Sequence, residues 1–157
     1  MKIPFTIEQF QEIFKNYNSS IWPLQIFFHL LAAIAILLSV KITRQSNKII
    51  AAILSFFWIW MGIVYHIINF TSINAAAYLF GAMFILQGIL FLYIFFVKQD
   101  ITFRFRPDIY GITGSIFIFF SLIIYPVPGY FTGHIYPYSP SFGLPCPTTS
   151  FTFGLLL

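Results

Sequence analysis

Three histidines and one cysteine are the side chains of this sequence best suited to binding a metal ion: His29, His66, His134 and Cys146. Imidazole nitrogens and thiolates bind zinc and copper, and two histidines on separate helices can hold a haem. No two of the four have the spacing of a metal-binding motif, so a site would exist only where the fold brings them together. A helix beginning next to Cys146 would favour its thiolate.

Polar side chains in the apolar segments also have a simpler interpretation. Tyr65 and Asn69 flank His66 near the end of one apolar segment, where they would meet water and lipid headgroups. Gln87 lies in the middle of another, where an interhelical hydrogen bond is worth about 1 kcal/mol. The candidate ligand-binding residues are therefore His29, His66, His134, Cys146, Tyr65, Asn69 and Gln87, and interhelical hydrogen bonding is the alternative role.

The motifs of the common enzyme classes are absent from the sequence. We find no phosphate-binding glycine loop, no Ser-His-Asp order and no paired carboxylates. No Asp, Glu, Lys or Arg lies inside the long apolar segments, and ion-coupled transporters usually depend on such a residue. No catalytic residue is predicted. Neither a basic helix nor a nucleic-acid-binding motif is present, so nucleic acid is not an expected partner.

The composition is typical of a membrane protein. Of 157 residues, 59% are hydrophobic and 8% are charged, whereas soluble proteins carry about 25% charged residues. Phenylalanine alone accounts for 22 residues. With one cysteine, no internal disulfide is possible. We expect a single membrane domain in contact with the lipid bilayer.

Apolar runs separated by polar segments predict an all-α, polytopic transmembrane helix bundle. Thr6 and Gln9 can form a capping box at the start of an amphipathic helix that lies at the membrane surface. A helix needs about 20 apolar residues to cross a bilayer. The predicted order is an interfacial helix at 1–19, four full spans at 22–40, 49–70, 75–97 and 109–125, an outer loop at 126–147 and a truncated fifth span at 148–157.

The fifth apolar segment is too short to cross a membrane. Thr148, Thr149 or Ser150 could cap it, and the ten residues from Thr148 to Leu157 would extend roughly 15 Å at 1.5 Å per residue. A terminal carboxylate at that depth is costly. We therefore expect the native protein to continue beyond Leu157.

The distribution of basic residues predicts the orientation in the membrane. Six of the eight Lys and Arg residues fall in 41–48 and 98–108, and the other two precede the first span. The positive-inside rule places both of these loops in the cytoplasm. The N-terminus and the uncharged loop at 126–147 would then lie outside, and the three histidines would lie in the outward half.

Four stretches carry a family resemblance: FWIWMGIVYHIINF, AAAYLFGAMFILQGILF, PDIYGI and HIYPYSPSFGLPCPTTSFTFGLLL. With these the chain resembles an uncharacterised family of multi-pass bacterial membrane proteins, a domain-of-unknown-function family, over almost its whole length. The resemblance implies a bacterial cytoplasmic membrane and further membrane helices after this stretch. It implies no activity, cofactor or site residue.

Together these observations predict an integral membrane protein without catalytic activity, acting as an accessory subunit or scaffold with a membrane-protein partner or a second copy of itself. The alternative is a protein that binds or transports a metal, haem or small solute through the His and Cys residues of the outer face. Convergence of those side chains would favour the alternative, and dispersed or pairwise-bonded side chains would favour the accessory role.

Overall fold

The computed structural model describes residues 4–98, 101–131, 133 and 135–157, and within them it is helical, with no strand beyond an isolated bridge between Phe142 and Leu144. The prediction of an all-α fold is confirmed. The α-helices are α1 (Ile7–Ile21), α2 (Leu24–Val40), α3 (Ser46–Trp60), α4 (Ala77–Tyr93), α5 (Ile109–Phe119), α6 (Val127–Phe131) and α7 (Pro145–Leu156). Three π-helical segments continue α3, α4 and α5, namely η1 (Met61–Asn69), η3 (Ile94–Lys98) and η4 (Phe120–Ile124), and a 3₁₀ turn, η2 (Phe70–Ser72), follows η1.

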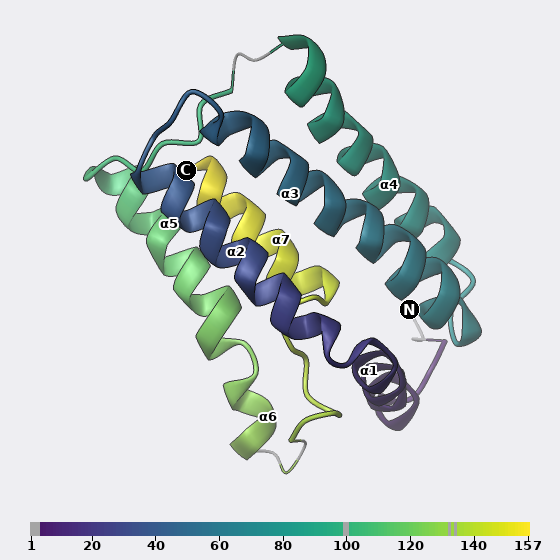
Figure 1. The fold of residues 1–157 in the computed structure, drawn as a ribbon. Helices are drawn as coiled ribbons and strands as arrows, with labels where there is room; N and C mark the ends of the chain where they lie inside the picture. Colours follow the sequence, from purple (N-terminus) through teal and green to yellow (C-terminus); the bar gives the residue numbers. More distant parts are fainter. Residues whose placement is uncertain (1–3, 99–100, 132, 134) are drawn as a thin grey trace.

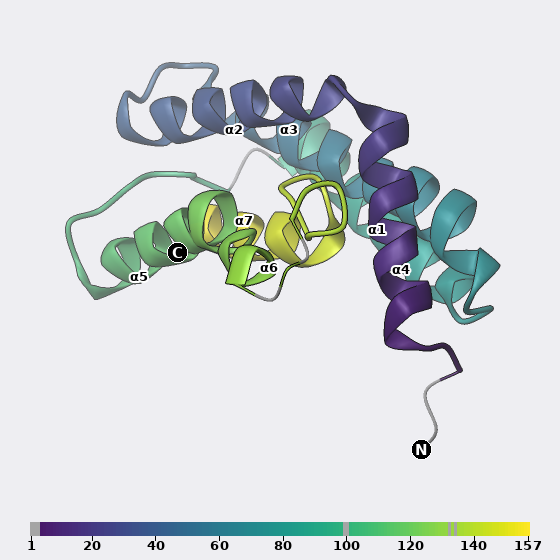
Figure 2. The ribbon, with the colours of Figure 1, turned by 90° about the horizontal axis from the view of Figure 1, so that it is seen from below.

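Five helices lie side by side, and α1 lies across one end of them. Figure 1 shows α5, α2, α7, α3 and α4 running roughly along a common direction. Seen from below, α1 stands nearly perpendicular to α2 (Figure 2), and the angle between the two helices is 84°. The short helix α6 lies at the same end as α1 (Figure 1).

The sequence of α1 explains its position. Thr6 caps the helix and forms the predicted capping box with Gln9, and the rings of Phe5 and Phe10 stack 5.6 Å apart as a hydrophobic staple. Ile13 and Tyr17 are buried, while the opposite face carries the charged residues. The amphipathic pattern therefore fixes which face of α1 packs on the bundle.

Two continuous helices are long and apolar enough to cross a membrane: Ser46–Ser72, with 27 residues, and Ile109–Gly129, with 21. The bent pair α1 and α2 makes a third if it is counted as one span, and α4 is a shorter apolar helix. The prediction of four full spans and a fifth is therefore only partly met. The reason is the length of the α-helical parts. α2 has 17 residues, and α4 has 17 before its π-helical continuation η3, about 25 Å at 1.5 Å per residue.

The loop predicted at 126–147 is partly helical, which corrects two boundaries. Residues 127–131 form α6, with Pro128 in its first turn, where the missing N–H does no harm. The last helix begins at Pro145 with Leu144 as its N-cap, so none of Thr148, Thr149 and Ser150 caps it.

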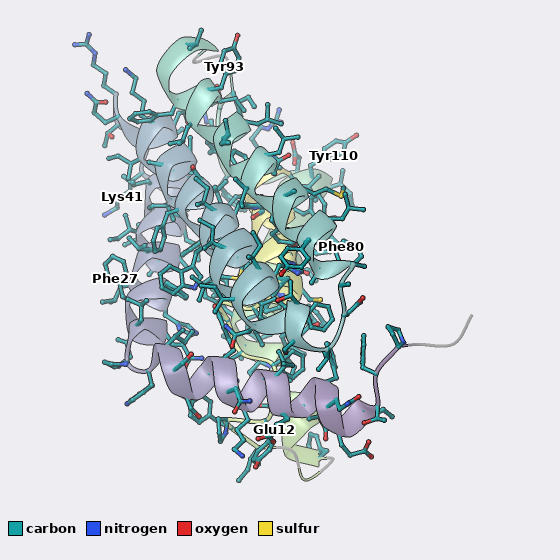
Figure 3. All side chains as sticks on the ribbon, turned by 90° about the vertical axis from the view of Figure 1, so that its right-hand side faces the viewer. Glu12, Phe27, Lys41, Phe80, Tyr93 and Tyr110 are labelled. Carbon is teal, nitrogen blue, oxygen red and sulfur yellow. The ribbon has the colours of Figure 1, made fainter. Side chains whose placement is uncertain are left out.

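The two basic segments meet at the end of the bundle opposite α1. Lys41 and Glu12, labelled in Figure 3, mark these two ends. The amide of Phe103 donates to Asn47 Oδ1 at 3.0 Å, and the amide of Phe105 donates to the carbonyl oxygen of Ser39 at 3.0 Å. The segment at 101–106 is thereby fastened across the ends of α2 and α3.

Candidate functional site

A cavity of about 340 Å³ lies where α1, the end of η1 and the start of α7 meet. Its walls come from segments far apart in the sequence, and its lining residues are mostly aromatic or proline. They are Phe5, Phe10, Phe14, Tyr65, His66, Phe70, Asn74, Phe80, Tyr125, Pro140, Leu144, Pro145, Cys146 and Pro147. We call this space the aromatic cavity. Its volume is at the lower end of the roughly 300–1,000 Å³ typical of ligand pockets.

His66 is the polar side chain buried most unfavourably in this wall. It is only 6% exposed, and neither ring nitrogen has a hydrogen-bond partner among the described residues. Its ring lies among aromatic rings, with centroids 4.7 Å from Phe84 and 6.0 Å from Phe80. An unpaired buried polar group costs about 1–3 kcal/mol, so this arrangement needs a compensating reason.

The backbone that carries His66 is itself unusual. His66 belongs to the π-helix η1, which has nine residues, and π-helical turns in α-helices are often found at functional sites. The side chain of Asn69 donates to the carbonyl oxygen of Val64 at 2.7 Å and satisfies a backbone acceptor of the same helix. Asn69 thus supports the π-helix and is absent from the cavity wall, although its position next to His66 made it a candidate.

Tyr65 and Cys146 line the same cavity as His66. Tyr65 is 3% exposed, and its ring contacts Tyr17 of α1 edge-on at 5.3 Å and stacks on Phe70 at 5.7 Å. Cys146, in the first turn of α7, is exposed and carries a free thiol. Three of the seven candidate residues therefore line one cavity.

His29 lines a different cavity, of about 480 Å³, with Trp22, Gln25 and Tyr136 among its neighbours. This second cavity shares no lining residue with the aromatic cavity. His29 Nδ1 lies 2.8 Å from the backbone carbonyl oxygen of Gln25. A carbonyl oxygen can only accept a hydrogen bond, so Nδ1 is the donor and carries the hydrogen. In the neutral ring, Nε2 is then an acceptor.

The remaining candidates lie elsewhere. Gln87 is half-buried on α4 and lines neither the aromatic cavity nor the cavity of His29. His134 lies outside the described residues. Within the described part of the chain, no three His, Cys, Asp or Glu side chains come together as a metal site would require. His29 and His66, which lie on separate helices, line separate cavities.

A buried polar cluster around Asn18 is the main feature that sequence reasoning missed. The Asn18 amide donates to the carbonyl oxygens of Pro137 at 2.7 Å and Ser139 at 3.0 Å, and its Oδ1 accepts from Gln25 at 2.8 Å and Ser141 at 2.9 Å. Asn18 is fully buried. This Asn18 cluster fastens residues 137–141 to α1 and α2. The sequence did contain a signal for this cluster, because Asn18 is a polar residue on the apolar side of an amphipathic helix.

Comparison with known proteins identifies a family and no activity. No curated protein and no solved structure matches the chain. The profile of a family of unknown function, DUF6064, matches residues 7–157, and the chain belongs to that family.

Proposed function

We propose that this member of the DUF6064 family is a membrane protein that holds a small, uncharged amphiphile in the aromatic cavity, with His66 as its polar contact. The proposal is carried by the ring nitrogens of His66: the side chain is 6% exposed, and neither nitrogen has a hydrogen-bond partner in the described part of the chain. A neutral imidazole has one donor and one acceptor. A ligand hydroxyl or carbonyl would satisfy one of them and offset the cost of burying the ring.

The lining of the aromatic cavity selects the class of ligand. None of its described lining residues is Asp, Glu, Lys or Arg, and moving an unpaired charge into an apolar site is very costly. Phe10, Phe70 and Phe80 are among the aromatic rings that line the cavity, and aromatic rings suit a flat or unsaturated apolar body. We therefore propose a neutral ligand with an aromatic or isoprenoid body and one hydroxyl or carbonyl group.

We further propose that all four predicted spans cross the membrane and that the aromatic cavity opens on the outer side. The continuity of α4 with η3 supports a third-span crossing, because Ala77–Lys98 then forms one helical stretch. The basic segments lie at the end of the bundle opposite α1, which agrees with a cytoplasmic position for them under the positive-inside rule.

An accessory or scaffold role is the second candidate function, and the exposed face of α5 favours it. Ile112, Ile116 and Phe119 are each more than half exposed. Of the two continuous candidate spans, Ile109–Gly129 has 17% of its apolar 18-residue window buried within the chain, against 56% for Ser46–Ser72. This face lies against lipid or against another membrane protein.

Binding of 2-naphthol, a neutral aromatic alcohol, tests the ligand proposal. The protein would be reconstituted in nanodiscs and titrated by naphthol fluorescence. We expect saturable binding by the wild type and a loss of about fivefold in affinity for His66→Phe, the value of one hydrogen bond of about 1 kcal/mol. His29→Phe, the same change in the other cavity, should bind as the wild type does. Absence of saturable binding, or equal losses in both variants, would refute the proposal.

A further inference from the structure

The end of the bundle opposite α1 carries an excess of positive charge. Arg44 and Lys48 lie at the start of α3, and neither makes an ion pair with a described residue. The turn that leads into α3 is fixed, because the Thr43 amide donates to Ser46 Oγ at 2.8 Å and the Ser46 amide donates to the carbonyl oxygen of Thr43 at 3.2 Å. Arg44 belongs to this turn, so its backbone is held next to that of Lys48.

Arg44 and Lys48 form one wall of a small cleft of about 60 Å³ between α3 and η3. Asn47 and Ala51 of α3 also line the cleft, and the apolar residues Ile94, Phe95 and Ile101 complete its lining. Asn47 is fixed by the hydrogen bond from the Phe103 amide to its Oδ1. The cleft therefore has a cationic side and an apolar side, built from segments about 50 residues apart in the sequence.

The volume and charge of this cleft suit a phosphate group. A space of about 60 Å³ admits a small group such as a phosphate, and the acyl chains of a lipid would lie outside it. A guanidinium and an ammonium group at one wall are the usual donors to phosphate oxygens. Since the opposite wall is apolar, the phosphate should carry an apolar body.

The surface beside the cleft supplies a place for that body. Leu90, Tyr93 and Val97 of α4 and η3 are 45%, 47% and 61% exposed. Leu90 and Tyr93 precede Ile94 of the cleft by about one turn or less, and Val97 follows it by less than one turn. The apolar surface that these three side chains form is therefore continuous with the apolar side of the cleft. A free phosphate ion would gain nothing from this surface.

We propose that the cleft between α3 and η3 binds the phosphate of an anionic phospholipid through Arg44 and Lys48, with the acyl chains lying along α4 and η3. Basic pockets between membrane helices bind anionic headgroups in this way. The site is at the opposite end of the bundle from the aromatic cavity. It is independent of the ligand proposed there.

Native mass spectrometry of the full chain in detergent, after incubation with phosphatidylglycerol or phosphatidylcholine, tests the proposal. We expect the wild type to retain phosphatidylglycerol preferentially. Arg44→Gln and Lys48→Gln should each reduce its retention about fivefold, since a basic residue near an anionic lipid surface contributes about 1 kcal/mol. Lys41→Gln is the matched control, because it removes the same charge at the same end without touching the cleft.

Each result decides between the site and its alternatives. Retention unchanged in Lys41→Gln and reduced in Arg44→Gln and Lys48→Gln, in protein of unchanged helical content, supports the cleft. An equal loss in Lys41→Gln would show diffuse charge attraction and overturn the proposal. Equal retention of the two lipids by the wild type would overturn it as well. Complete displacement of phosphatidylglycerol by millimolar inorganic phosphate would assign the cleft to the free ion.

Discussion

Gly62 and Gly81 face each other backbone to backbone where η1 packs on α4. A Cβ atom on Gly62 would lie 2.8 Å from the carbonyl oxygen of Gly81, and a Cβ atom on Gly81 would lie 2.9 Å from that of Gly62. Real Cβ atoms do not approach a backbone atom so closely, so both positions require glycine for the helices to pack at this distance. Small residues allow such close approach between membrane helices.

Gly81→Ala should destabilise the protein by about 1–3 kcal/mol, because the added methyl group forces η1 and α4 apart. The measurement is thermal unfolding in detergent, followed by circular dichroism. Ala82→Leu is the control, since residue 82 is on the same helix and exposed. If Gly81→Ala unfolds at the same temperature as the wild type, the glycine contact does not determine how these helices pack.

The Asn18 cluster should be a second determinant of stability. Asn18→Ala removes four side-chain hydrogen bonds and leaves buried partners unsatisfied, for an expected loss of about 2–4 kcal/mol. Hydrogen exchange should increase most at residues 137–141, which lose their hydrogen bonds to the Asn18 side chain. Asn16→Ala is the matched control, because Asn16 is exposed on the same helix. Equal effects of the two substitutions would contradict a structural role for the cluster.

The helices other than α6 could be predicted from the sequence because each follows from local information. Apolar runs interrupted by polar segments mark the helices of the bundle, and the Thr6–Gln9 capping box fixes the start of α1. The errors were also local. The predicted outer loop begins at residue 126, yet Pro128 fits the first turn of α6. Pro145 opens α7 three residues before the predicted caps.

The aromatic cavity could be predicted only in part, because its walls meet through tertiary packing. Chemical type selected His66 and Cys146, the position next to His66 selected Tyr65, and all three line the cavity. Tyr125 and the phenylalanines of the wall are indistinguishable in sequence from residues that face lipid. The π-helix around His66 also has no sequence pattern that separates it from an α-helix, since the two differ only in which backbone groups bond.

Alkylation of Cys146 should block the aromatic cavity. The thiol is exposed and lies in the cavity wall, so an N-ethylmaleimide adduct would place a bulky group where a ligand enters. We expect 2-naphthol affinity to fall roughly tenfold, about 1.4 kcal/mol, and Cys146→Ser to be unaffected by the reagent. Binding that is unchanged in fully alkylated wild type would show that 2-naphthol does not use this cavity.

The same thiol gives the sharpest test of orientation in the membrane. Cys146 lies at the end of the bundle near α1, and Gln45 lies in the exposed basic segment at the other end. With a membrane-impermeant maleimide added to intact cells, we expect labelling of Cys146 and protection of Gln45→Cys in a Cys146→Ser background. Permeabilised cells should label both, which controls for accessibility of the new thiol. Labelling of Gln45→Cys together with protection of Cys146 on intact cells would place the basic segments outside and reverse the predicted topology.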